Sequence, residues 1–272
     1  MGADGTSKPG GQPSEPGGSA DTAAARQAWT PSSSIHGVLF DIDDTLVDLR
    51  TAMGKTIEHV SAGYLPDMTA QQWAEFKRIF WADPDGRYDA YLRGEVSFAE
   101  QRIARAALAF GTAGAELDAA EGERWNVSFE EHAHTYWQLF DDVLPALDAL
   151  DEAGIPYGAI SNNVHAYQRT KLDTCGLERI GVLVGTDTVG VPKPAPEIFR
   201  EGARRLGSHP SATLYVGDNL LVDAVGAADA GLVGVWLNRD ARRAQEVLSG
   251  HGVEGGYTGI ELDSLSALEG LL

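Results

Sequence analysis

Residues 38–46 read Val-Leu-Phe-Asp-Ile-Asp-Asp-Thr-Leu, an apolar run that stops abruptly at three carboxylates within four residues. A short apolar run of this kind predicts a buried strand, here over residues 37–40. Two charges about 4 Å apart repel each other by roughly 4 kcal/mol near a protein surface, so carboxylates packed this densely must share protons or hold a cation. The stretch therefore predicts a strand end that carries a metal site with reactive oxygens.

The composition limits the partners of this chain. Its 272 residues, 43% of them hydrophobic, are enough for one large domain or for one domain with an insertion. The formal net charge is -19, which argues against nucleic acid and against an anionic membrane as partners, since both would be repelled. An anionic ligand must then be captured by local cations and backbone N–H groups.

Signals for export or membrane insertion are missing from the sequence. No apolar stretch approaches the length of about eighteen residues that spans a bilayer, and the N-terminus lacks the basic-then-apolar pattern of a secretion signal. Cys175 is the single cysteine, which excludes an internal disulfide and a cysteine zinc cluster. We therefore expect a soluble, cytoplasmic protein.

The pattern of hydrophobic residues changes twice along the chain. Residues 1–34 are rich in Gly, Ser, Pro and Ala and predict a disordered tail. Residues 49–141 read as successive helices, with apolar side chains at helical spacing such as Trp73, Phe76 and Phe80. From residue 142 onwards, short apolar strands alternate with amphipathic helices. The strands are expected over residues 157–160, 180–184, 213–216 and 233–237. This alternation predicts an α/β fold with a doubly wound parallel sheet.

Polar side chains follow these strands at the points where they end. They are Asp41, Asp43, Ser161, Asn162, Asp218 and Asp223, and Lys193 lies in a loop before a helix. Ligands of such sheets bind at the carboxyl ends of the strands, so we expect these side chains to meet in one crevice. Each is weak evidence alone, because Asp-x-Asp also occurs in metal-binding sugar transferases, Ser161 could simply cap a helix, and a single lysine is most often solvated.

Taken together and in this order, these residues resemble the haloacid dehalogenase-like superfamily of aspartate-nucleophile phosphohydrolases. The resemblance rests on four segments, DIDDTL at 41–46, AISN at 159–162, KPAPEIF at 193–199 and GDNLLVD at 217–223. It implies a Rossmann-like core formed by residues 35–48 and 142–272. The helical residues 49–141 resemble the cap domain that the family inserts after its first motif.

The resemblance also implies a mechanism. Asp41 would attack phosphorus to give an aspartyl phosphate, and Asp43 would act as general acid for the leaving oxygen and then as base for the hydrolytic water. The expected cofactor is Mg²⁺, a hard cation that prefers oxygen ligands. By resemblance it is held by the Asp41 side chain, the Asp43 backbone carbonyl and Asp218.

The remaining motif residues would bind phosphate or support the metal. Ser161 would hydrogen-bond the transferring phosphoryl group, with Asn162 as its neighbour, and Lys193 would neutralise phosphate charge and keep Asp41 ionised. Asp223 would ligate the metal or orient its water, unless it is an exposed acid at a helix start. Asp44 is expected to be structural or to face solvent.

Asp43 separates the possible reactions. Members that cleave carbon–halogen bonds lack an aspartate there, so a phosphatase acting on a small-molecule phosphomonoester is preferred over a haloacid dehalogenase. A sugar phosphomutase would keep the same core residues and stays an alternative. A receiver-like signalling module is disfavoured by the long insertion. Substrate identity should lie in the cap, where the candidate contacts are Arg87, Tyr88, Tyr91 and Arg93.

Overall fold

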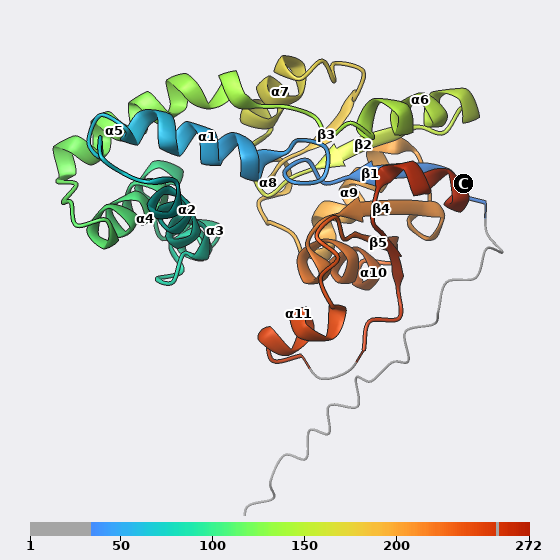
Figure 1. Cartoon of the computed structure of the whole chain (residues 1–272). Helices are drawn as coiled ribbons and strands as arrows, with labels where there is room; N and C mark the ends of the chain where they lie inside the picture. The colour runs from blue at the N-terminus through green and yellow to red at the C-terminus, as the bar shows by residue number, and fades with distance from the viewer. Residues whose placement is uncertain (1–33, 254–255) are drawn as a thin grey trace, which may run out of the picture.

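A six-stranded parallel sheet forms the centre of the molecule (Figure 1). The computed structural model describes residues 34–253 and 256–272. The strand order is β3-β2-β1-β4-β5-β6, and every neighbouring pair is parallel. The strands are β1 (Gly37–Phe40), β2 (Tyr157–Ile160), β3 (Val182–Val184), β4 (Thr213–Gly217), β5 (Val233–Leu237) and β6 (Ile260–Leu262). The predicted parallel α/β sheet is confirmed, with β6 as an additional edge strand.

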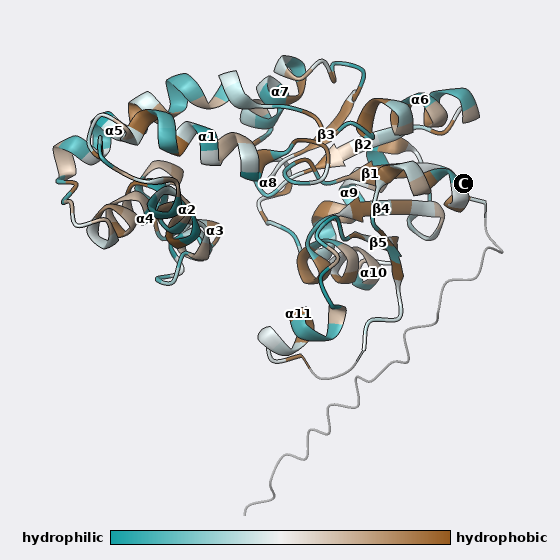
Figure 2. Ribbon diagram, viewed as in Figure 1, coloured by the Kyte–Doolittle hydropathy of each residue, from teal (hydrophilic) through white to brown (hydrophobic). Residues whose placement is uncertain are grey.

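Helices cover both faces of this sheet because the strands are apolar on both sides. Val38 and Phe40 belong to one hydrophobic core, which includes Leu147 of α6, whereas Leu39 belongs to a second core with Phe199 of α9. The helices of this region are α6 (Val143–Ala153), α7 (His165–Thr174), α8 (Thr186–Val189), α9 (Pro196–Leu206), α10 (Gly226–Asp229) and α11 (Ala244–Gly250). Figure 2 shows β4 and β5 as largely hydrophobic ribbons, whereas α6 and α7 carry hydrophilic stretches.

The chain between β1 and β2 forms a separate helical layer, drawn at the left of Figure 1. Its helices are α1 (Leu49–Ser61), α2 (Ala70–Ala82), α3 (Arg87–Leu92), α4 (Phe98–Thr112) and α5 (Ala119–Ala133). They enclose their own core, in which the predicted stripe of Trp73, Phe76 and Phe80 packs with Trp125 and Phe129. Capping boxes at Thr69, Ser97 and Asp118 start α2, α4 and α5.

The proposed domain boundaries at residues 48/49 and 141/142 remain a prediction, and residues 1–33 of the expected tail lie outside the described residues. None of the helices within 34–253 and 256–272 is long and apolar enough to cross a membrane.

Register brings the strand ends together. Phe40 lies opposite Ala159 of β2 and Val216 of β4, so residues just beyond these three strands share one edge of the sheet. The strand order also reverses on either side of β1, since β2 follows on one side and β4 on the other. Ligands bind at such a switch point in parallel sheets, which places the candidate site directly beyond Phe40.

A half-buried ion pair between Asp142 and Arg239 stabilises the start of α6, where the chain returns from the helical layer to the sheet. Arg239 donates to both carboxylate oxygens of Asp142 at 2.8 and 2.9 Å, and Asp142 also accepts from Ser264 Oγ and the backbone N–H of Leu265, both at 2.8 Å. Burial alone would raise the pKa of Asp142, but these hydrogen bonds outweigh it and hold the pKa below its usual value.

Asp142→Asn is expected to lower the free energy of unfolding at neutral pH by about 2–4 kcal/mol, because it removes a bidentate, charge-assisted contact. The pKa of Asp142 is lowered in the folded state, so this stabilisation is present above the ordinary aspartate pKa of about 3.9 and is lost as the pH falls below it. Urea unfolding at several pH values checks this. The exposed Asp148, a partner of Arg179, supplies the control Asp148→Asn, which should change little. The free energies of unfolding of wild type and Asp142→Asn should approach each other below about pH 4. If the difference between them stays constant there, the stabilising role of the ionised Asp142 is contradicted.

Candidate active site

Asp41 lies directly beyond β1, at the edge of the sheet, and the loop that follows turns back at Asp44. The Asp41 backbone N–H donates to Val216 O at 2.8 Å, which continues the ladder with β4. Asp44 adopts a left-handed conformation (φ 61°), and its carboxylate accepts from the backbone N–H of Arg50 at 2.7 Å. The Asp44 carboxylate therefore stabilises the turn, which agrees with the structural role expected for it.

Lys193 lies at the centre of the site. Its Nζ donates to Asp41 Oδ1 at 2.5 Å, to Asp223 Oδ1 at 2.7 Å and to the Tyr215 hydroxyl at 2.9 Å. Burial would lower the pKa of Lys193, but the carboxylates of Asp223 and Asp41 raise it well above its ordinary value. The ammonium therefore stays charged in the interior. Lys193 and Asp41 therefore lie in direct contact.

Asn162 holds the Lys193 loop in place. Its Nδ2 donates to Lys193 O at 2.9 Å, and its Oδ1 accepts from the Lys193 backbone N–H at 2.6 Å. This side chain thus links the end of β2 to the lysine loop. Its neighbour Ser161 is buried and accepts a hydrogen bond on Oγ from Gln168 Nε2 at 2.7 Å.

Asp223 is brought into the site by an irregular helix. The segment Leu220–Val225 is a π-helix whose N-cap Asn219 accepts on Oδ1 from the N–H groups of Leu221 and Val222. A π-turn often marks a functional site. Asp223 is only 1% exposed and packs against Gly217, where an added Cβ would lie 2.4 Å from the Asp223 carboxyl carbon. The alternative of an exposed acid at a helix start is therefore wrong, because Asp223 is buried against Lys193.

Asp218 is tied to the β1 loop. Its backbone N–H donates to the buried Thr45 Oγ1 at 3.1 Å, and its carbonyl accepts from Trp236 Nε1 at 3.0 Å. The carboxylate stays partly exposed, with 30% of the side chain accessible. Thr45 thereby fixes the distance between the two loops that carry Asp41 and Asp218.

Asp41, Asp218 and Asp223 form a cluster of carboxylates suited to a cation. One oxygen of each lies within 4.8 Å of the others. Burial and the neighbouring carboxylates, Asp223 above all, outweigh the opposing Lys193 and raise the pKa of Asp41 to about 7 and that of Asp218 to about 8. A hard divalent cation would relieve this repulsion, and oxygen ligands are what Mg²⁺ prefers. The donor set therefore fits the expected metal.

Asp43 takes no part in this cluster and contacts α7 instead. Its carboxylate forms an ion pair with the buried Lys171 and accepts from Gln168 Nε2 at 2.7 Å. Gln168 thus bridges Asp43 and Ser161. The sequence analysis missed Gln168 and Lys171. Their spacing of three places both side chains on one face of α7, which was the only signal in the sequence.

A cavity of about 470 Å³ separates these residues from the helical layer. Asp43, Asp218 and Lys171 line it from the side of the sheet, and Tyr88 and Arg105 from the other side. Of the predicted cap contacts only Tyr88 is among the lining residues. The exposed Arg87 and Arg93 pair with Asp85 and Glu95, and Tyr91 packs against Tyr88 and Phe98.

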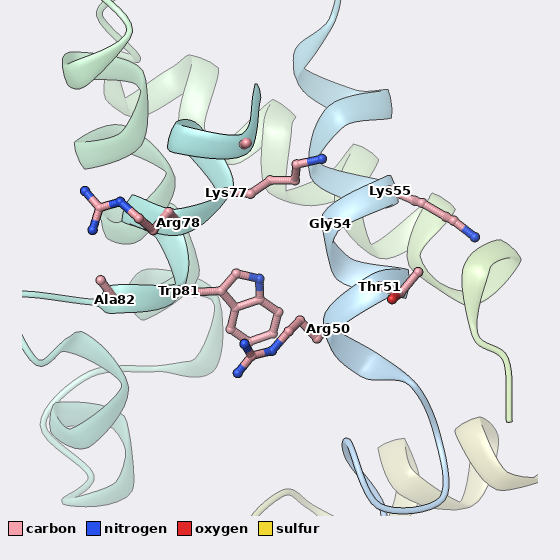
Figure 3. Close-up of a pocket in the computed structure, with 9 residues that line it drawn as sticks. Arg50, Thr51, Gly54, Lys55, Lys77, Arg78, Trp81 and Ala82 are labelled. Atoms are coloured by element: carbon pink, nitrogen blue, oxygen red, sulfur yellow. The ribbon is translucent and has the colours of Figure 1, made fainter. Parts of the chain in front are cut away.

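A second, more open cavity of about 740 Å³ lies between α1 and α2 (Figure 3). Its basic side chains are Arg50, Lys55, Lys77 and Arg78. The Trp81 ring projects into it from α2, and Arg50 Cζ lies 5.6 Å from the ring centroid. It holds none of the motif residues, so the smaller cavity is the candidate active site. Trp81 and Ala82 line both cavities, which places a locally positive surface beside the site.

Known proteins resemble this chain over most of its length. The family model of the haloacid dehalogenase-like hydrolases matches residues 35–231. The glyceraldehyde 3-phosphate phosphatase of Methanopyrus kandleri is 30% identical over 218 residues, which cover 75% of this chain and 84% of that protein. The phosphoglycolate phosphatase of Xanthomonas campestris pv. campestris is 33% identical over 206 residues, 74% of this chain and 81% of that one.

Solved structures share the fold. The HAD-hydrolase YfnB of Bacillus subtilis, described as bound to magnesium, is 23% identical with a TM-score of 0.69, covering 88% of this chain and 99% of that one. The L-2-haloacid dehalogenase RSc1362 is 18% identical with a TM-score of 0.66, covering 88% and 98%. These likenesses show a Rossmann-like core with a helical cap. By its family match and its fold, the chain is a hydrolase that belongs to the haloacid dehalogenase-like family.

Proposed function

We propose that this protein is a Mg²⁺-dependent phosphatase that hydrolyses a small-molecule phosphomonoester through an aspartyl phosphate on Asp41. The proposal depends mainly on the different surroundings of the two carboxylates that follow β1. Asp41 lies with Asp218, Asp223 and Lys193, whereas Asp43 is held apart by Lys171 and Gln168. The similarity to proteins named as phosphatases supports it.

Phosphoryl transfer requires that negative charge be neutralised before a carboxylate approaches phosphorus. Lys193 supplies a fixed positive charge beside Asp41, and Ser161 lies at the neighbouring strand end with its hydroxyl oriented by Gln168. We assign Lys193 and Ser161 to the transferring phosphoryl group. Asn162 supports them by fixing the lysine loop.

Asp41 and Asp218, with the Asp43 backbone carbonyl, would hold Mg²⁺, and Asp223 would ligate it or orient its water. When bound, the metal neutralises phosphate charge and reduces the repulsion between Asp41 and Asp218. Asp223 already accepts from Lys193, Tyr215 and the backbone N–H of Asn219. These contacts favour the orienting role for Asp223, because its oxygens are already engaged.

Asp43 is assigned the proton transfers. It would protonate the leaving oxygen and then take a proton from the water that hydrolyses the aspartyl phosphate. Lys171 and Gln168 fix its carboxylate, which lines the cavity that would receive the ester. A dehalogenase has no need of this acid, so the contacts of Asp43 favour the phosphatase although dehalogenases share the fold.

Removal of the metal tests the proposed function. With Mg²⁺ present, the protein should hydrolyse an aryl phosphate, and EDTA should abolish the activity, which excess Mg²⁺ should then restore. Halide release from a haloacid serves as the comparison and should not be detected. Hydrolysis that persists in EDTA, or halide release without phosphatase activity, would rule the proposal out.

A further inference from the structure

Arg105 of α4 is a buried cation without a carboxylate to bind. It is 8% exposed, and its Nε and Nη1 donate to two neutral acceptors, Phe80 O at 3.0 Å and Gln101 Oε1 at 3.1 Å. Within residues 34–253 and 256–272 it forms no ion pair. The other cavity-lining arginine, Arg102, pairs with Glu130. Arg105 thus differs from its neighbour on the same helix.

The carboxylate that acts most strongly on Arg105 is already occupied. Asp83 accepts from the backbone N–H groups of Arg87 and Tyr88 at 3.0 and 2.7 Å, one on each oxygen. It therefore caps the start of α3 and does not bind the guanidinium. Burial lowers the pKa of Arg105 against this attraction, although an arginine remains charged at any physiological pH.

Burying a charge is costly unless an opposite charge accompanies it. The stacking of Arg105 on the Phe80 ring, with Cζ 4.3 Å from the centroid, offsets only part of that cost. A guanidinium has five N–H donors, and Phe80 O and Gln101 engage two of them. The remaining donors match the two oxygens of a carboxylate. Arg105 is therefore equipped for one further planar anion.

The position of Arg105 connects it to the reaction. It lines the cavity that also holds Asp43 and Lys171. Tyr88 lines the same cavity, on the side of the helical layer. The Arg105 side chain therefore faces the space where the non-phosphate end of a bound ester would lie. One guanidinium beside Asp83 favours a singly charged group over a second phosphate.

We propose that Arg105 binds a carboxylate at the end of the substrate remote from the phosphate, so that the preferred substrates are phosphomonoesters of small hydroxy acids. This inference rests on the proposed phosphatase function and names the substrate class that the cavity selects. A cavity of about 470 Å³ accommodates such a compact molecule.

Matched pairs of substrates test this inference. Short ω-carboxyalkyl phosphates are compared with alkyl phosphates of the same chain length by phosphate release in Mg²⁺. Wild-type protein should prefer the carboxylated ester by about ten- to a hundredfold in kcat/KM, and Arg105→Gln should remove that preference. Arg105→Lys, which keeps the charge but loses the planar fork, should retain part of it. Both esters are measured on one preparation of each variant. Partial unfolding lowers both kcat/KM values equally and therefore does not change their ratio.

The matched control is Arg78→Gln, since Arg78 is an exposed arginine of α2 bound to Glu75 and should leave the ratio at the wild-type value. Equal kcat/KM values for both esters with the wild-type protein, or an Arg105→Gln variant that keeps the preference, would overturn the inference and leave the phosphatase assignment intact. Failure to hydrolyse any ester, an aryl phosphate included, would instead reject the proposed function and this inference with it.

Discussion

Asp41→Asn is expected to lower kcat for an aryl phosphate by about 10⁴-fold or more, because an amide cannot form the covalent intermediate. The substitution is nearly isosteric, and the Asn oxygen still accepts from Lys193.

Burial raises the pKa of Asp41 to about 7, so its ionised form is unfavourable in the metal-free fold. A raised acid pKa costs stability as the pH rises above the ordinary value. In EDTA at pH 8 the Asn variant should therefore unfold at the same urea concentration as wild type or at a higher one.

Steady-state phosphate release, together with urea unfolding, measures both effects. Asp44→Asn is the control within the same loop, because the Asp44 carboxylate accepts a hydrogen bond from the backbone N–H of Arg50 in the turn. This variant should keep activity within about tenfold of wild type. An Asp41→Asn protein that is folded and still turns over would remove Asp41 from the role of nucleophile.

Asp43→Asn is expected to reduce activity in a way that depends on the leaving group. For alkyl phosphates kcat/KM should fall by about 10²–10⁴-fold, because an alkoxide leaves poorly without a proton. For a nitrophenyl phosphate the loss should be much smaller, since nitrophenolate leaves unprotonated. The Asn oxygen still accepts from Lys171, so the variant should fold.

A series of esters with leaving groups of increasing pKa checks this prediction. A plot of log kcat/KM against that pKa should be shallow for wild type and steep for Asp43→Asn. The series contains its own control, because all esters transfer the same phosphoryl group to Asp41. Parallel lines for the two proteins would show that Asp43 does not protonate the leaving oxygen.

The topology of the sheet explains how much of the site could be predicted. Asp41, Ser161 and Asp218 follow apolar strands, and parallel strands bring their carboxyl ends to one edge. The strands at residues 37–40 and 157–160 are confirmed with the same bounds. β6 was missed because three residues, Ile260–Leu262, carry too little pattern to be told from a loop.

Contacts between distant segments could not be predicted from one sequence. Lys171 and Asp43 are far apart in the chain, and a lysine on a helix is usually solvated, so its burial follows only from how α7 packs against the sheet. Asp223 was predicted as a site residue, but the π-helix that carries it was not, because Leu220 and Leu221 give no sign of a π-turn. Arg105 was missed for a similar reason, since helical periodicity does not reveal which polar residues face a cavity.

The most direct test of the central claim is to trap the phosphorylated protein. Wild-type protein turning over an aryl phosphate in Mg²⁺ is quenched in acid, reduced with borohydride, which converts an aspartyl phosphate to homoserine, and mapped by peptide mass spectrometry. Homoserine at position 41 in wild type, and its absence in Asp41→Asn, is the result predicted. Turnover without any modification, or modification at another aspartate, would contradict the proposed mechanism.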